Sequence, residues 1–139
     1  MPDIFADTAG WGHLVDPTQV YHARAADLYR SARQQGNKLI TSNYILTELA
    51  ALLTSPLRIP RPAIAAFIES LKASPYVEII HVDISLDAQA WQLFSQRLDK
   101  NWSLVDCASF VIMQHHNILE AFTTDHHFEQ ACFVCLLKD

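Results

Sequence analysis

The chain has 139 residues, of which 50% are hydrophobic and 18% charged, and its formal net charge is −5. This composition excludes an intrinsically disordered chain, and the length suits one domain, residues 1–139, that buries a core without disulfides or a structural metal. The excess of acid also argues, at first sight, against a nucleic-acid partner, because phosphate binding normally requires a basic surface.

Short apolar strands alternate with helices through the first half of the chain. Residues 4–6 are predicted to be a buried strand that ends in a Thr-Ala-Gly turn. Asp16 and Pro17 have the residue types of a helix N-cap and first helical position, and Gly36 ends that helix. The elements that follow are a strand over 38–41, a helix over 43–53 capped by Ser42 and, beyond a proline-rich loop, a helix over 63–73.

The second half repeats this alternation. β-branched residues at 77–82 predict a third strand, and apolar positions at helical spacing predict a long helix over 86–98. Ser103 is expected to cap a helix that ends near Asn117, because asparagine tolerates the left-handed position that ends a helix. The last two predicted elements are strands over 121–124 and 133–137.

Brief apolar strands between helices predict an α/β fold, a three-layer α/β/α arrangement around a five-stranded parallel sheet. In such folds the ligand site lies beyond the carboxyl ends of the strands. The sequence shows no readable secretory signal and no apolar run long enough to span a bilayer, and its three cysteines suit reduced thiols. We therefore expect a cytoplasmic protein.

Cys132 and Cys135 form a C-x-x-C pair with two histidines just upstream, a spacing found in zinc sites. We interpret residues 131–137 as a strand, in which positions i and i+3 face opposite sides of the sheet. These thiols are therefore predicted to be small buried hydrophobic groups rather than zinc ligands. The two histidine pairs, at 115–116 and 126–127, are interpreted as exposed helix-end and loop residues.

Four acids fall at the predicted carboxyl edge of the sheet. Asp7 directly follows the first strand and Asp125 the fourth. Glu48 lies in the second turn of the helix after the second strand, and Asp106 lies in the first turn of the helix capped by Ser103. Converging carboxylates repel one another, so such a cluster is tolerated mainly when a hard divalent cation compensates its charge. Oxygen ligands of this kind suit Mg²⁺ or Mn²⁺.

Each of these acids also has a purely structural interpretation. Ser103 and Asp106 match a capping box, and Asp7 and Asp125 can be ordinary turn residues at strand ends. Glu48 is harder to explain in this way, because it lies in a mostly apolar helix where burying a charge is expensive. The joint placement of all four acids at one edge favours a functional site.

Four short segments carry a family pattern: Phe5-Ala6-Asp7-Thr8, Thr41-Ser42-Asn43-Tyr44 leading to Thr47-Glu48, Trp102-Ser103-Leu104-Val105-Asp106-Cys107-Ala108-Ser109-Phe110, and Thr123-Thr124-Asp125-His126-His127-Phe128. In order and spacing they resemble the PIN-domain family, and in particular its VapC-type toxin branch. The resemblance implies a five-stranded parallel sheet and a Mg²⁺- or Mn²⁺-dependent ribonuclease. It also shows a departure, because Cys132 stands where an Ala-Gly-Phe segment is common.

The resemblance also implies roles for individual residues. Carried over onto this sequence, the metal-binding and catalytic acids are Asp7, Glu48, Asp106 and Asp125, and the supporting polar residues are Thr8, Asn43, Ser103 and Thr124. We expect phosphodiester hydrolysis in single-stranded or looped RNA, in which one or two ions held by these acids lower the pKa of an attacking water and stabilise the leaving oxygen.

Two other functions of this fold class need residues that the sequence lacks, and a third stays open. A phospho-receiver domain needs a lysine at the end of its late strands, and a haloacid-dehalogenase-like phosphatase needs a second aspartate two residues after the first; neither is present. The alternative kept open is a catalytically inactive PIN-like module that binds protein or RNA. Such a module is expected to have lost an acid, and no acid of the pattern is lost here.

The helix pair over 43–73 is unusually apolar, which predicts core packing and also a patch that forms a homodimer or binds a partner. The resemblance implies that this partner is a cognate antitoxin protein. Arg58 and Arg61 are candidate contacts to RNA phosphates. Without the four site acids, 11 acidic residues face 10 basic ones, so the net charge no longer argues against RNA.

Overall fold

Short parallel strands form the centre of the molecule. The computed structural model describes residues 2–138, and the strands in this part are β1 (Ile4–Ala6), β2 (Leu39–Ser42), β3 (Val77–Ile80), β4 (Glu120–Phe122) and β5 (Val134–Cys135). All neighbouring strands are parallel, in the order β3-β2-β1-β4-β5. The predicted five-stranded parallel sheet is confirmed.

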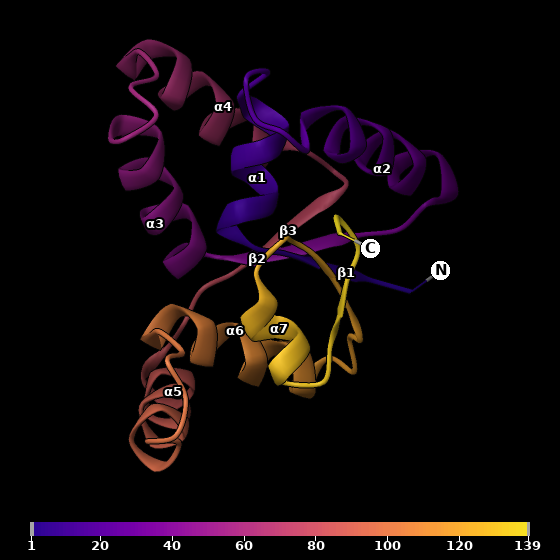
Figure 1. Cartoon of the computed structure of the whole chain (residues 1–139). Helices are drawn as coiled ribbons and strands as arrows, with labels where there is room; N and C mark the ends of the chain where they lie inside the picture. Colours follow the sequence, from indigo (N-terminus) through magenta and orange to yellow (C-terminus); the bar gives the residue numbers. More distant parts are fainter. Residues whose placement is uncertain (1, 139) are drawn as a thin grey trace.

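The helices lie in two groups on opposite faces of this sheet (Figure 1). One face carries α1 (Thr8–Val15), α2 (His22–Gln35), α3 (Asn43–Thr54) and α4 (Arg61–Ala73), and the other carries α5 (Ile84–Gln96), α6 (Leu104–His115) and α7 (His126–Gln130). None of these helices is long and apolar enough to cross a membrane.

The strand order explains both this division and the position of a ligand crevice. Crossovers between parallel strands have a constant hand, so the chain changes face when it passes from β3 at one edge to β4 on the far side of β1. The connections after β1 and β4 therefore leave the sheet on opposite faces. Such a switch point, beyond the carboxyl ends of the strands, is where α/β folds bind ligands.

Aromatic side chains fill the core on both faces of the sheet. On the α1 face, Trp11 is fully buried, and its ring meets those of Phe67 and Phe122 edge-on at centroid distances of 6.3 and 5.9 Å. On the other face, the rings of Phe110 in α6 and Phe128 in α7 are 5.0 Å apart. Burying a side chain of this size stabilises the fold by roughly 1.5–3 kcal/mol. These rings fix α1, α6 and α7, whose first residues come to the switch point.

The segment after β1 corrects one prediction. Residues 8–15 are a helix, α1, where a turn was predicted, and the next helix begins at His22 rather than at Pro17. Two glycines among eight residues obscure α1, because glycine is a poor helix former. Asp16 ends α1 instead of starting α2, and its carboxylate accepts a hydrogen bond from the backbone N–H of Thr18 that stabilises the turn.

The predicted caps agree with the structure. Gly36 ends α2 in the left-handed conformation with a φ of 78°, and Asn117 follows α6 with a φ of 54°. The hydroxyls of Ser42 and Ser103 accept backbone N–H groups at the starts of α3 and α6. Most other boundaries differ from the predicted ones by a residue or two, as is usual for helix and strand ends.

The C-terminal part corrects a second prediction. Residues 126–130 form the short helix α7, and β5 contains only Val134 and Cys135. Cys132 therefore lies outside the strand, and its φ of 71° is a conformation that favours glycine. The strand argument against a zinc site is thus wrong for Cys132, which is exposed. Cys135 is buried. Among residues 2–138, the group of neighbouring side chains that could bind a metal consists of Asp125, His126 and His127 and includes neither cysteine.

Of the three glycines, Gly10 in α1 has the least room for an added methyl group. A Cβ there would lie 2.0 Å from the carbonyl oxygen of Phe122 in β4, whereas at Gly12 the nearest atom is a flexible Leu52 methyl at 3.2 Å. We expect Gly10→Ala to lower the free energy of unfolding by about 3 kcal/mol or more, since backbone must move. Gly12→Ala should cost far less. Urea unfolding followed by circular dichroism measures both, and equal midpoints would contradict this contact.

Candidate active site

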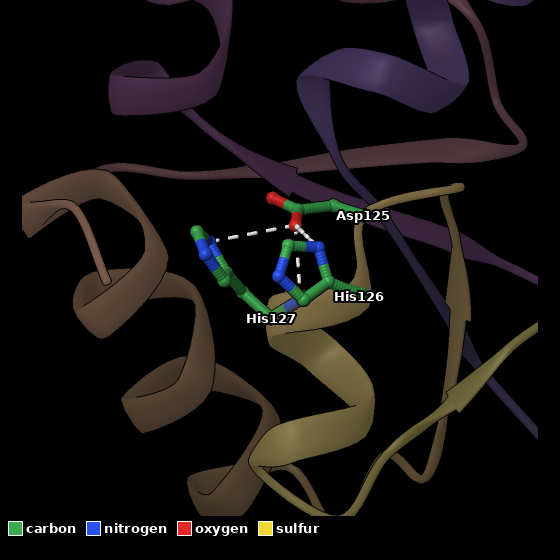
Figure 2. A group of neighbouring side chains, drawn as sticks. All are labelled: Asp125, His126 and His127. Atoms are coloured by element: carbon green, nitrogen blue, oxygen red, sulfur yellow. Dashed lines mark hydrogen bonds and ion pairs between the residues drawn. The ribbon is translucent and has the colours of Figure 1, made fainter. Parts of the chain in front are cut away.

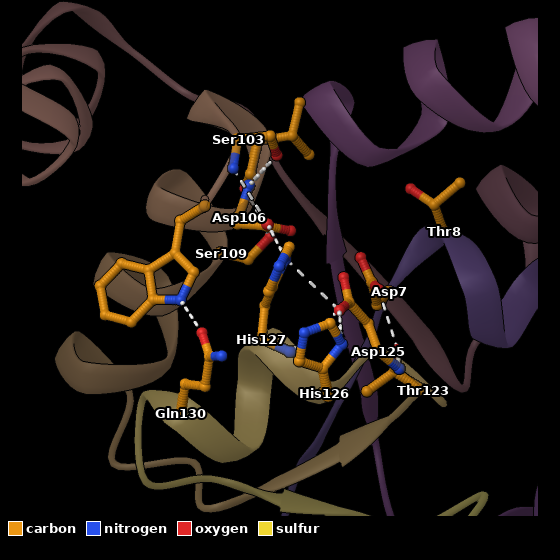
Figure 3. Close-up of polar contacts among 12 residues, drawn as sticks. Asp7, Thr8, Ser103, Asp106, Ser109, Thr123, Asp125, His126, His127 and Gln130 are labelled. Atoms are coloured by element: carbon orange, nitrogen blue, oxygen red, sulfur yellow. Dashed lines mark hydrogen bonds and ion pairs between the residues drawn. The ribbon is translucent and has the colours of Figure 1, made fainter. Parts of the chain in front are cut away.

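Three carboxylates meet at the switch point of the sheet. Asp7 follows β1, Asp125 follows β4, and Asp106 lies in the first turn of α6. Figure 3 shows their side chains gathered on one side of the sheet edge, with Asp7 and Asp125 close together and His127 between Asp125 and Asp106. The structure therefore brings together three of the four acids predicted from the sequence, although they are far apart along the chain.

Asp7 is the most deeply buried acid of this group. Its side chain does not cap α1, so the turn-residue interpretation does not account for it; instead Oδ2 accepts a hydrogen bond of 2.9 Å from the Thr123 hydroxyl. Burial raises the pKa of Asp7 to about 7, and the negative charges of Asp106 and Asp125 act in the same direction. The ionised form is thus costly unless a positive charge joins the site.

Asp106 forms the predicted helix cap and also contacts another residue of the cluster. It completes the predicted capping box with Ser103, whose backbone N–H donates to Oδ2 at 3.0 Å. The same oxygen lies 3.0 Å from Nδ1 of His127. Burial and then the neighbouring charge of Asp125 raise the pKa of Asp106, against the effect of these hydrogen bonds. A helix cap alone requires neither a histidine at 3.0 Å nor a second acid close enough to raise the pKa of Asp106, so capping does not account for all of its contacts.

Asp125 caps the short helix α7, whose first two residues are His126 and His127. Its Oδ1 accepts the backbone N–H of His127 at 2.9 Å and lies 3.4 Å from Nδ1 of the same residue. The interpretation of His127 as an exposed loop residue is wrong, because its side chain is only 20% exposed and lies among the acids. His126, 64% exposed, and the pair at 115–116 are exposed as predicted.

Glu48, in α3, is connected to the other acids through Thr8. Its side chain is half-buried, and Oε1 accepts a hydrogen bond of 2.5 Å from the hydroxyl of Thr8, the residue after Asp7. This contact explains how a charge is tolerated in a mostly apolar helix. It also links Glu48 to the β1 end of the cluster, and the supporting role of Thr8 stays a prediction.

The other two predicted polar residues, Thr124 and Asn43, form hydrogen bonds with partners other than the acids. Thr124 contacts Nε2 of His13 at 3.4 Å. Asn43 accepts the backbone N–H of Val82 at 2.7 Å, so it ties the start of α3 to the chain after β3. Its side chain also lines a cavity of about 810 Å³ between α3, α4 and β3, whose walls include Lys72. None of these contacts involves one of the four acids.

Sequence reasoning missed one residue that organises the site. Thr123 is fully buried at the end of β4, where its hydroxyl donates to Asp7 and accepts the backbone N–H of Asp125 at 3.0 Å. It therefore connects the carboxylates that follow β1 and β4. The available signal was its position just before Asp125 in a Thr-Thr-Asp segment, of which only the second threonine was singled out.

The donor set fits a hard divalent cation. Asp7, Asp106 and Asp125 supply carboxylate oxygens from three elements, and their mutual repulsion contributes to the raised pKa of Asp7. Carboxylate oxygens are the preferred protein ligands of Mg²⁺, Mn²⁺ and Ca²⁺. A cation in this position would relieve the cost of ionising Asp7. Glu48, one hydrogen bond further away through Thr8, can contribute a direct ligand or hold a water.

Comparison with known proteins identifies a family and relatives that match most of the chain. The family model of the PIN domain matches residues 4–134. The 23S rRNA-specific endonuclease VapC20 of Mycobacterium tuberculosis, from strains CDC 1551 and H37Rv, is 32% identical over 131 residues, which cover 94% of this chain and 95% of the relative. The crystal structure of M. tuberculosis VapC20, described as a sarcin–ricin loop cleaving toxin, superposes with a TM-score of 0.85 at 31% identity and covers 95% of this chain and 97% of the other.

Proposed function

Because this chain belongs to the PIN domain family, we propose that it is an endoribonuclease and the toxin of a toxin–antitoxin pair. The observation that carries the proposal is the meeting of Asp7, Asp106 and Asp125 at the switch point, with Asp7 buried and its pKa raised to about 7. The similarity to an rRNA endonuclease over 94% of the chain supports it. The alternative of an inactive module is disfavoured because all four acids are retained.

The proposed cofactor is Mg²⁺ or Mn²⁺, held by Asp7, Asp106 and Asp125, with Glu48 as a further ligand. When bound, such an ion lowers the pKa of a water and offsets the charge of a phosphodiester. The protein's part is to keep the carboxylates fixed. Thr123 holds Asp7, the Ser103 backbone holds Asp106, and the α7 backbone holds Asp125.

The proposed substrate is a looped RNA, since a similar protein is named as a 23S rRNA-specific endonuclease and its crystal structure is described as that of a sarcin–ricin loop cleaving toxin. Outside the four acids the charges nearly balance, with 11 acidic and 10 basic residues. RNA binding should therefore depend on the cation and on RNA shape more than on a broad basic surface. Arg58, in the loop before α4, and Arg61, the first residue of α4, are both exposed and remain the proposed phosphate contacts.

The proposed protein partners are a cognate antitoxin and a second copy of the chain in the cytoplasm. Much of the apolar stripe on α3 and α4 is core, because Leu49, Leu53, Ile64 and Leu71 are buried. Among residues 2–138, the large exposed apolar side chains lie elsewhere, most densely at Ile84, Trp91, Phe94 and Leu98 in and just after α5. The α5 surface is therefore a better candidate for a protein contact than the predicted helix pair.

The activity is tested by incubating the purified full chain with ribosomal RNA in Mg²⁺, Mn²⁺ or chelator and sequencing the new RNA ends. We expect cuts at a few discrete loop positions that appear only with a divalent cation. RNA that is bound but never cut would favour the inactive-module alternative, and cuts that persist in chelator would contradict a cation-dependent site.

The contact between Thr8 and Glu48 gives a separate prediction. Thr8→Val keeps the shape of the side chain and removes the hydroxyl that donates to Glu48. We expect the RNA cleavage rate to fall about tenfold, in the range seen when partners of metal ligands are removed. Thr54→Val, at the exposed end of α3, is the matched control and should cleave normally. A Thr8→Val rate equal to that of the control would remove Thr8 from the site.

A further inference from the structure

An imidazole ring lies between two of the site acids. Nδ1 of His127 is 3.0 Å from Asp106 Oδ2 and 3.4 Å from Asp125 Oδ1, and the ring is 20% exposed. Each of these oxygens already accepts a backbone N–H, from Ser103 at 3.0 Å and from His127 at 2.9 Å. A carboxylate oxygen accepts up to two hydrogen bonds, so Nδ1–H of His127 can donate to Asp106 while no cation is bound. With the proton on Nε2 instead, the Nδ1 lone pair lies beside both carboxylates and can bind a cation that they hold.

A second imidazole lies beside the first. Nδ1 of His126 is 3.8 Å from Asp125 Oδ1, and the two histidine rings are 4.5 Å apart between centroids. One ligand atom from each of Asp125, His126 and His127 lies within 4.8 Å of the others (Figure 2). Ligands at about 2.1 Å from one cation are themselves about 3.0 to 4.2 Å apart, so only a small closing movement separates these atoms from one coordination shell.

We propose that His127 adds an imidazole nitrogen to the cation held by the acids, with His126 as an exposed further donor, and that the site therefore prefers Mn²⁺ to Mg²⁺. Imidazole suits transition metals, whereas Mg²⁺ strongly favours oxygen. The proposal rests on the proposed function, because it concerns the same cation. It also explains why Asp125 is followed directly by two histidines at the start of α7.

Pulsed electron paramagnetic resonance of Mn²⁺ added to the full chain tests this directly. A bound imidazole gives a nitrogen modulation of the Mn²⁺ signal, and growing the protein with histidine labelled in the heavy nitrogen isotope should change that modulation. The wild-type chain alone thus decides the question. His127→Gln should remove most of the modulation and lower the ratio of Mn²⁺ to Mg²⁺ affinity about tenfold. His115→Gln, at an exposed position of α6, should leave both unchanged.

The outcomes separate this proposal from the proposed function. Mn²⁺ that binds in a manner dependent on Asp106, but without nitrogen modulation, overturns the imidazole ligand and leaves the nuclease site intact. Modulation that survives in His127→Gln and is lost in His126→Gln overturns the assignment to His127. A wild-type chain that binds no Mn²⁺ overturns both proposals.

Discussion

Replacing Asp7 by asparagine is expected to slow RNA cleavage at least about a thousandfold, or about 4 kcal/mol in transition-state stabilisation. Asp7 is the innermost of the acids, and its carboxylate is fixed by Thr123 at the end of β4. Asparagine keeps the shape and one oxygen but removes the charge that holds a cation. The rate is measured on one RNA hairpin with saturating Mn²⁺. A variant that cuts as fast as the wild type would show that Asp7 is not a ligand.

The same substitution should make the protein more stable at pH 8 in chelator, because an ionised carboxylate at 4% exposure is replaced by a neutral amide. Loss of activity with a gain in melting temperature identifies a residue kept for function rather than for folding. Asp27→Asn is the matched control, since this aspartate is 75% exposed beside Arg30, and neither property should change. An Asp7→Asn chain that melts below the wild type would indicate a structural role instead.

The second large effect concerns pH in the absence of a cation. The pKa of Asp7 is about 7 in the folded chain and near its ordinary 3.8 in the unfolded chain, so between these values the folded state holds a proton that the unfolded state has released. The contribution of Asp7 to the free energy of unfolding should then fall by roughly 4 kcal/mol as pH rises from about 4 to about 7 and stay level above that. The raised pKa of Asp106 acts in the same direction.

Urea unfolding at several pH values in chelator isolates this contribution. The difference in unfolding free energy between Asp7→Asn and the wild type should be small near pH 4 and grow to roughly 4 kcal/mol by pH 7. Added Mn²⁺ should reduce that difference, because a cation bound only to the folded chain stabilises the ionised acid. A difference that is constant from pH 4 to pH 7 would contradict the burial and crowding of Asp7.

The convergence of the acids was predictable because it depends on topology. Once strands and helices alternate, the residues that follow β1 and β4 must reach the same sheet edge, whatever the loop details. Asp7 and Asp125 were placed by this rule, and Asp106 was placed by the cap at Ser103. The family resemblance added the nuclease activity, which the alternation of elements does not contain.

The missed features depend on contacts that a sequence pattern does not show. α1 has two glycines among its eight residues, and one of them is there because β4 passes too close for a side chain. α7 is a short helix after Asp125, too short to show a helical periodicity in the sequence. The contact between His127 and Asp106 depends on this helix and could not be predicted without it. Thr123 acts through two hydrogen bonds to other segments.

The most direct test of the central claim is the cleavage rate of one RNA hairpin against Mn²⁺ concentration, for the wild type and for single substitutions of the acids. If Asp7, Glu48, Asp106 and Asp125 form one cation-dependent site, each of Asp7→Asn, Glu48→Gln, Asp106→Asn and Asp125→Asn should lower the maximal rate, raise the Mn²⁺ concentration needed for half of it, or both. The wild type should be inactive in chelator. Wild-type cleavage that persists in chelator, or a set of variants with unchanged curves, would contradict the claim.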